Sequence, residues 1–289
     1  MVRQKKPDYD AVVIGAGFSG LYMLHSLREN GYTVKVFEKA NGVGGTWYWN
    51  RYPGARCDSD SIFYNFTFSE ELFKGWTWSS RYPEQPEILA YLNYVADTLN
   101  LRDGIQFNTA VTSAVYHEDK NMWRIYTDDG ESVTATFFIT GVGCLSAANI
   151  PDFKGLDSFE GEWYHTGRWP HKKVDFTGKR VGVIGTGSSG VQAIPVIAEE
   201  AKHLTVFQRT PQYSFPARNH PYDPEFVEKA KENFAQLKKE LRESYSGQLV
   251  KSRKYSALDD TPEERQKAYE ARWQEGGYLF VYEDLLFNE

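Results

Sequence analysis

Three features of the sequence predict an α/β fold with two Rossmann-like, doubly wound domains and a helical insertion. A glycine-rich stretch occurs twice, each copy lies between apolar runs, and the chain takes on a helical texture after residue 222. Apolar runs that alternate with helical patterns are typical of parallel sheets covered by helices. At 289 residues, the chain is long enough for two domains.

The repeat has an offset of 170 residues, which is the distance from Gly15 to Gly185. Residues 12–39 read VVIGAGFSGLYMLHSLRENGYTVKVFEK, and residues 181–209 read VGVIGTGSSGVQAIPVIAEEAKHLTVFQR. Each copy contains an apolar run, a G-x-G-x-x-G turn, a helical pattern and a second apolar run. The turn glycines are Gly15, Gly17 and Gly20 in the first copy and Gly185, Gly187 and Gly190 in the second.

Each glycine of such a turn has a physical task. The first allows the tight turn, the second lets a diphosphate approach the backbone, and the third lets the helix pack close to the strand. The phosphates then lie at the helix N-terminus, where unpaired N–H groups and the dipole favour negative charge. The repeat therefore predicts two dinucleotide sites, and the alternative is a pair of structural turns that bind no nucleotide.

The two copies differ where the second apolar run ends. The first copy has Glu38, 23 residues after Gly15, and an acidic residue at this place accepts hydrogen bonds from a ribose. The second copy has Gln208 followed by Arg209. An arginine can pair bidentately with a 2′-phosphate, which a carboxylate would repel. We therefore predict FAD or NAD in the first copy and NADPH in the second; an ordinary surface arginine is the alternative for Arg209.

The region between the copies predicts a helix over 86–101 and strands over 105–107, 111–117, 123–127 and 133–140. Asp128-Asp129-Gly130 is typical of a hairpin turn between the last two strands. The last strand is apolar enough to be buried.

Two helices are expected after the second copy. Asp223-Pro224 predicts the start of the first, which ends at Gly247 and has an apolar face of Phe226, Ala230, Phe234, Leu237 and Leu241. A capping box from Thr261 to Glu264 predicts the second, which ends at Gly276. The sequence then finishes in the apolar stretch 278–287, and each domain has fewer strands than a doubly wound sheet needs. We therefore expect an apparently truncated, N-terminal portion of a longer protein.

Composition argues against several functions. The net charge of −6, from 33 basic and 39 acidic side chains, lacks the basic excess of a nucleic-acid-binding protein. No apolar stretch approaches the roughly 18 residues of a membrane helix, and the glycines within residues 11–24 argue against a signal peptide. Cys57 and Cys144 form neither a disulfide framework nor a C-x-x-C, which predicts a cytoplasmic location and argues against a disulfide reductase. No metal-ligand spacing is present.

Two further motifs carry a family resemblance. Residues 44–58 read GGTWYWNRYPGARCD, and residues 159–170 read FEGEWYHTGRWP, which is Phe159-x-Gly161-x-x-x-His165-x-x-x-Trp169-Pro170. Together with the two glycine turns, these motifs resemble those of the Baeyer–Villiger monooxygenases. The related flavin-containing monooxygenases usually lack Trp-Pro at the end of the second motif. The resemblance covers the whole chain, although the family's chains are considerably longer.

The resemblance implies an FAD- and NADPH-dependent enzyme that inserts one oxygen atom of O2 beside a ketone carbonyl, through a C4a-peroxyflavin, to give an ester or lactone. It assigns a catalytic role to Asp58, whose carboxylate would hold an arginine that has no counterpart here. A buried Asp58 without that partner should be driven toward its protonated form. Contacts to FAD are implied for the turn glycines Gly15, Gly17 and Gly20 and for Ser19, Glu38, Gly45, Thr46, Trp47, Trp49, Asp58, Tyr64 and Val111. Contacts to NADP are implied for Arg56, Thr186, Gly187, Ser188, Ser189, Gly190, Gln192, Gln208 and Arg209.

These assignments leave alternatives open. Trp47 and Trp49 could be plain core packing, and we interpret His165 as a linker residue rather than a general base. The alternative functions are an N-hydroxylating or flavin-containing monooxygenase and an inactive nucleotide-binding fragment. The expected partners are a small ketone, O2 and a missing C-terminal portion. The expected domains are 1–145 for FAD, 146–221 for NADP with a linker at 146–178, and a helical insertion at 222–289.

Overall fold

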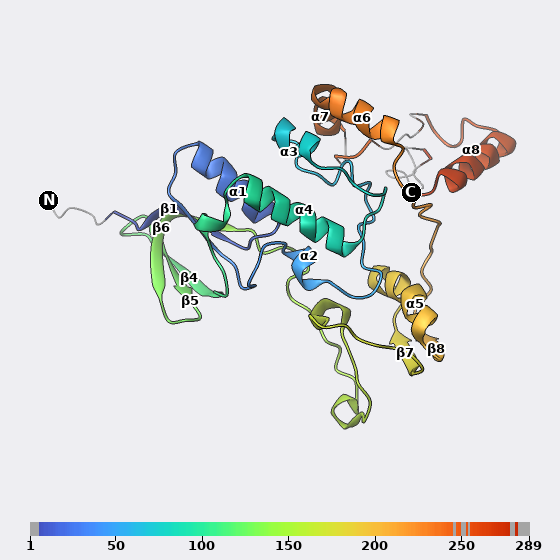
Figure 1. The fold of residues 1–289 in the computed structure, drawn as a ribbon, viewed down its shortest axis with the longest axis horizontal. Coiled ribbons are helices and arrows are strands. Elements are labelled where there is room, and N and C mark those ends of the chain that lie inside the picture. Colours follow the sequence, from blue (N-terminus) through green and yellow to red (C-terminus); the bar gives the residue numbers. More distant parts are fainter. Residues whose placement is uncertain (1–5, 245–246, 250–252, 254, 278–280, 283–289) are drawn as a thin grey trace. The chain divides into compact units, whose positions relative to one another are not determined.

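The computed structural model describes residues 6–244, 247–249, 253, 255–277 and 281–282. The chain divides into two compact units, and Figure 1 labels its helices and strands. The first comprises Met1–Ala55 and Gln85–Thr177, and the second comprises Arg56–Glu84 and Gly178–Glu289. No sequence motif predicts that segment 56–84 groups with the second glycine repeat.

The first unit is built on a six-stranded sheet with the order β3-β2-β1-β6-β5-β4. Its strands are β1 (Tyr9–Ile14), β2 (Val34–Phe37), β3 (Ile105–Gln106), β4 (Val111–His117), β5 (Met122–Thr127) and β6 (Ser132–Thr140). The first four in sheet order are parallel, whereas β5 and β4 continue the sheet antiparallel. The hairpin turn predicted at residues 128–130 is confirmed between β5 and β6.

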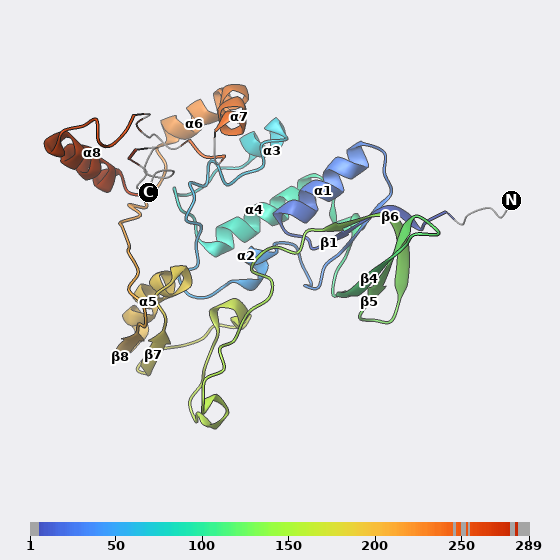
Figure 2. The ribbon, with the colours of Figure 1, turned by 180° about the vertical axis from the view of Figure 1, so that it is seen from behind.

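The helices of the first unit are α1 (Phe18–Glu29), α2 (Thr46–Trp49) and α4 (Gln85–Thr98), with short 3-10 turns η1 (Arg102–Gly104), η2 (Leu156–Ser158) and η3 (Thr166–Arg168). Helices α1 and α4, labelled in Figures 1 and 2, meet at the rings of Phe18 and Tyr91, whose centroids lie 6.2 Å apart. Their inner faces are fully buried at Leu21, Leu24, Ile88, Leu92 and Val95. Each such side chain stabilises the fold by about 1.5–3 kcal/mol, so this packing fixes the start of α1 against the sheet.

Strand β6 is less buried than its apolar sequence predicts. Ala135 is inaccessible, but Phe137 is 51% exposed and lies edge-on to Tyr32, with 6.5 Å between ring centroids. The expectation of a buried strand therefore holds for part of β6 only.

The second unit contains a parallel pair, β7 (Arg180–Ile184) and β8 (His203–Phe207), covered by α5 (Ser188–Glu200). Its other helices are α3 (Glu70–Gly75), α6 (Pro224–Glu232), α7 (Phe234–Glu243) and α8 (Pro262–Glu275). The capping box of α8 is confirmed. Thr261 Oγ1 accepts from the backbone N–H of Glu264, and the Glu264 carboxylate accepts from the backbone N–H of Thr261.

The single helix expected from Asp223 to Gly247 is wrong in its length. Helix α6 ends at Glu232. The side chain of its C-cap, Asn233, donates to the Lys229 carbonyl at 2.8 Å, which also accepts from the Asn233 backbone N–H at 3.0 Å. Helix α7 then starts at Phe234, whose ring lies 5.0 Å from that of Phe73. The capping asparagine and the buried ring together break the apolar stripe into two helices.

Within the part of the chain that the structure describes, no helix has the length and apolar character needed to cross a bilayer.

Candidate functional site

The first candidate site lies at the carboxyl ends of three neighbouring parallel strands. Ile14 of β1 is in register with Phe37 of β2 and with Thr140 of β6. The residues that follow these three ends are Gly15, Glu38 and Gly141. Ligands of open α/β sheets bind outside such an edge, so the first repeat is placed where a dinucleotide would bind.

Glycines bring the backbone segments at this edge unusually close together. A Cβ at Gly20 would lie 1.8 Å from the carbonyl oxygen of Gly15, and a Cβ at Gly15 would lie 2.7 Å from that of Gly141. A Cβ at Gly45 would lie 2.9 Å from Gly17 Cα. Side chains are therefore excluded from all three segments, which leaves a cradle of bare backbone that a diphosphate can approach.

Helix α1 begins at this cradle with its amides available. Its N-cap is Gly17, which supplies no side-chain acceptor, and the first turn contains no acidic residue. The N-terminal amides and the helix dipole therefore favour an anion. Ser19, which the resemblance assigns to FAD, lies in this first turn.

Glu38 is a buried carboxylate that closes the cradle on the β2 side, with 5% of its surface exposed. Its Oε2 accepts from the Ala16 backbone N–H at 2.6 Å, and its Oε1 accepts from that of Ala40 at 2.7 Å. Each carboxylate oxygen has room for a second hydrogen bond. The group is thus oriented by the chain and can still accept from ribose hydroxyls.

Helix α2 presents two tryptophans of different character. Trp47 is buried, and its carbonyl accepts from the Gln85 side chain, which fits the core-packing alternative. Trp49 is 36% exposed and lies 6.0 Å from the ring of His171. Burial, and then the charge of Arg51, lower the pKa of His171, so this neighbour of Trp49 is neutral at neutral pH. Thr46 opens α2, and Val111, a further residue assigned to FAD, is half-buried at the start of β4.

The second candidate site repeats the first on β7, β8 and α5. Ile184 is in register with Phe207, so Gly185 and Gln208 follow two strand ends at one edge. Gly185 has a φ of +97°, and a Cβ at Gly190 would lie 2.4 Å from the carbonyl oxygen of Gly185. The N-cap of α5 is Gly187, again with no side-chain cap and no acidic residue in the first turn. Ser188 and Ser189 form that first turn.

In both sites, the residue after the second strand binds the residue between the first two turn glycines, but the hydrogen-bonding roles are reversed. In the first, Glu38 accepts a hydrogen bond from Ala16, the residue between the first two turn glycines. In the second, the Gln208 side chain donates to Thr186 Oγ1, at the equivalent position, over 2.7 Å. A neutral donor thus stands where the first site has a carboxylate. Arg209 follows it at the end of β8 and is exposed.

Arg56 and Gln192, which are 136 residues apart in sequence, meet beside α5. The Arg56 backbone N–H donates to Gln192 Oε1 at 3.3 Å, and Gln192 Nε2 donates to the Arg56 carbonyl at 3.1 Å. Both residues, like every other residue assigned to NADP, belong to the second unit. The residues assigned to FAD lie in the first unit except for Asp58 and Tyr64, which lie in the second.

Asp58 is exposed in the structure, so the condition of burial, under which the carboxylate would favour its protonated form, is not met. Tyr64 is half-buried, and its backbone N–H donates to the carbonyl of Asp60 at 3.0 Å.

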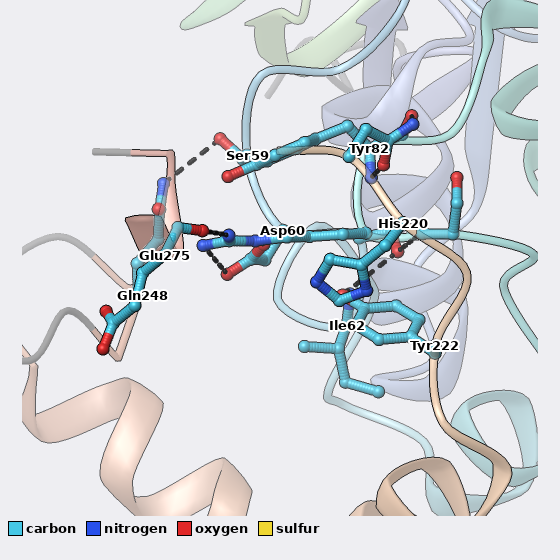
Figure 3. A network of polar contacts seen from close by, with 12 residues as sticks. Ser59, Asp60, Ile62, Tyr82, His220, Tyr222, Gln248 and Glu275 are labelled. Carbon is cyan, nitrogen blue, oxygen red and sulfur yellow. Dashed lines mark hydrogen bonds and ion pairs between the residues drawn. The ribbon is translucent and has the colours of Figure 1, made fainter. Parts of the chain in front are cut away.

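A polar network fixes the segment that carries Asp58 (Figure 3). Asp60 forms an ion pair with Arg81, whose guanidinium also donates to the Glu275 carbonyl at 3.0 Å. Tyr82 and Asn219 exchange two hydrogen bonds, of 2.9 and 3.2 Å. No motif in the sequence predicts this network; the local signal for it is the second acidic residue of Asp58-Ser59-Asp60.

The structure also describes the surroundings of His165 and of the two cysteines. His165 Nδ1 accepts from the Gly167 backbone N–H at 3.2 Å and caps the turn η3, which favours the linker interpretation over a general base. Cys57 is buried and Cys144 is exposed. Burial raises the pKa of the Cys57 thiol to about 11.

Comparison with known proteins decides the family. A family model described as flavin-binding monooxygenase-like matches residues 9–259. The chain belongs to the flavin-binding monooxygenase-like family. A Baeyer–Villiger monooxygenase of Pseudooceanicola batsensis is 49% identical over 277 residues, which are 95% of this chain and 51% of that protein. The resemblance stated from the motifs is thereby confirmed.

Solved structures of this family agree with the fold. An oxidized steroid monooxygenase bound to NADP is 54% identical with a TM-score of 0.93, over 97% of this chain and 54% of that one. The OTEMO complex with FAD and NADP is 41% identical with a TM-score of 0.93, over 97% and 54%. The chain spans about half the length of the relatives that it matches.

Proposed function

We propose that the protein containing this chain is an FAD- and NADPH-dependent monooxygenase that inserts one oxygen atom of O2 beside a ketone carbonyl, giving an ester or lactone. The observation that carries the proposal is the pair of glycine cradles with unlike strand ends, Glu38 in one and Gln208 with Arg209 in the other. The names of the relatives support the same reaction.

The first cradle fits FAD. Its glycines leave bare backbone for a diphosphate, the α1 amides face that space, and the Glu38 carboxylate is oriented toward a ribose. Trp49 offers an exposed aromatic surface to a flat ring. When bound, FAD supplies the oxygen chemistry, while these residues bind and orient it.

The second cradle fits NADPH. The α5 amides would hold the diphosphate, and Arg209 would pair with the 2′-phosphate in a place where no carboxylate repels it. Thr186 Oγ1 already accepts from Gln208, so its hydroxyl hydrogen is directed elsewhere and can be donated to a phosphate oxygen.

We propose that Asp58 pairs with a cationic side chain of the protein that contains this chain. Its exposure in this chain supports that role, because the carboxylate is accessible to a partner. The network around Asp60 and Arg81 fixes the backbone of the same segment and so limits where the carboxylate can reach. A small ketone and O2 are the proposed substrates, and the two cysteines without a disulfide support a cytoplasmic location.

Oxygenation of ketones tests the proposal. The polypeptide that contains residues 1–289 is incubated with NADPH, O2 and a panel of cyclic and linear ketones, and products are identified by mass spectrometry. We expect esters or lactones that carry one atom of 18O from 18O2. Sulfoxides or N-oxides from added thioethers and amines, with no ester from any ketone, would contradict the ketone assignment and favour the N-hydroxylating alternative.

A further inference from the structure

Glu84 forms an ion pair with Arg56, a residue assigned to the nucleotide site. Arg56 Nη2 lies 2.8 Å from Glu84 Oε1, and the two residues form an antiparallel β-bridge. The bridge is extended by a hydrogen bond from the Cys57 N–H to the Pro83 carbonyl, of 3.2 Å. Side chains opposite each other on such a bridge are close neighbours, so the backbone itself places the carboxylate beside the guanidinium.

A second contact fixes Arg56 relative to α5. Gln192 binds both the N–H and the carbonyl of Arg56, and it lies four residues after Ser188, the first residue of the helix. Four residues are about one helical turn, or roughly 6 Å along the axis. The backbone of Arg56 is therefore held close to the amides that start α5.

We propose that Glu84 is a positioning residue that orients Arg56 and weakens its attraction for the diphosphate of a nucleotide bound at the N-terminus of α5. The inference rests on the proposed function, because it requires a dinucleotide in the second cradle. A carboxylate at 2.8 Å both directs a guanidinium and offsets its charge. The anion then competes with Glu84 for the same N–H donors.

From its position, the Arg56–Glu84 pair should act on the diphosphate of a bound dinucleotide rather than on the 2′-phosphate. Arg56 is bound to α5, whereas Arg209 follows the end of β8, where the ribose of a dinucleotide is recognised. Glu84 should therefore affect NADP+ and NAD+ equally, since both contain the diphosphate. Arg209, in contrast, should discriminate between them.

Isothermal titration of the 289-residue chain with NADP+ and NAD+ tests the proposal. Glu84→Gln keeps an acceptor oxygen but removes the charge, so we expect Kd to fall roughly 2–5-fold for both nucleotides, the range for a partly exposed ion pair. Glu228→Gln is the matched control, because Glu228 is an exposed carboxylate on α6 and its loss changes the net charge equally. The control should leave both Kd values unchanged.

A double-mutant cycle shows whether Glu84 acts through Arg56. In the Arg56→Ala background, Glu84→Gln should no longer change either Kd. The inference would be overturned if the unaltered chain binds both nucleotides but Glu84→Gln raises the affinity equally with and without Arg56. A higher affinity for NADP+ alone, or no change in affinity for either nucleotide, would overturn it too. Failure of the unaltered chain to bind either nucleotide would instead contradict the proposed function, and this inference with it.

Discussion

At the residue scale, Gly20 shows how completely the first cradle depends on the absence of side chains. Its missing Cβ would lie 1.8 Å from the Gly15 carbonyl oxygen, so Gly20→Ala must push α1 away from β1. We expect a loss of about 3 kcal/mol or more in the free energy of unfolding, measured by urea denaturation. Gly130→Ala is the control: its φ is +87° but nothing lies within 4 Å, so it should cost only about 1–2 kcal/mol. Similar losses for both variants would show that the close approach is not real.

Arg209 is the residue on which cofactor selectivity depends. Arg209→Ala should weaken NADP+ binding about 10–100-fold, the value of one or two charge-assisted hydrogen bonds. NAD+ binding should change by less than about 2-fold, because NAD+ lacks the 2′-phosphate. Titration calorimetry with both nucleotides measures the two effects, and equal losses would show that Arg209 does not bind the 2′-phosphate.

Cys57 gives the fold a pH dependence with a definite sign. Burial raises the pKa of its thiol to about 11 in the folded chain, from the ordinary value of 9.0. Between these values the unfolded chain loses the proton and the folded chain keeps it, so stability is full below pH 9 and falls as pH rises toward 11. This shift is worth about 2–3 kcal/mol. Cys57→Ala should remove this part of the alkaline loss in the free energy of unfolding, measured by urea denaturation at several pH values. An unchanged dependence of that free energy on pH would contradict the burial effect.

The sequence predicted those residues whose partners are a few positions away or belong to a repeated motif. The turn glycines and Glu38 are examples, because the strand–turn–helix unit dictates its own geometry. The pairs Arg56–Gln192 and Asp60–Arg81 could not be predicted, since their partners lie 136 and 21 residues apart. Their contacts depend on how whole segments pack, which no local pattern encodes.

At the element scale, the break between α6 and α7 shows where periodicity fails as a guide. The apolar stripe continues through Asn233, but a cap and a buried ring end the helix there. The burial of β6 could not be predicted fully for a similar reason. An apolar run shows that a strand can be buried, but it does not show which other elements cover it.

Phe234 at that break is expected to anchor α7. It is 5% exposed and packs with Ile62 and Phe73, so Phe234→Ala should cost about 3–5 kcal/mol. Phe226→Ala on α6 is the control: the ring is 45% exposed and stacks on Tyr222, so the loss should stay below about 1.5 kcal/mol. Equal losses in thermal denaturation would show that the aromatic cluster does not hold α7.

At the scale of the whole molecule, the chain places its two repeats in different compact units. Every residue assigned to NADP lies in the second unit, together with the segment 56–84 that carries Asp58. The glycine repeat predicted two sites of one design, and the structure shows that design in both. The grouping of segment 56–84 with the second repeat came only from the three-dimensional contacts.

The central claim is that one chain contains two diphosphate cradles for unlike dinucleotides. Sequential calorimetric titration of the 289-residue chain, first with FAD and then with NADP+, tests it most directly. We predict that one equivalent of each binds, and that saturating FAD leaves the Kd for NADP+ nearly unchanged. Displacement of one nucleotide by the other, or a single equivalent in total, would contradict it.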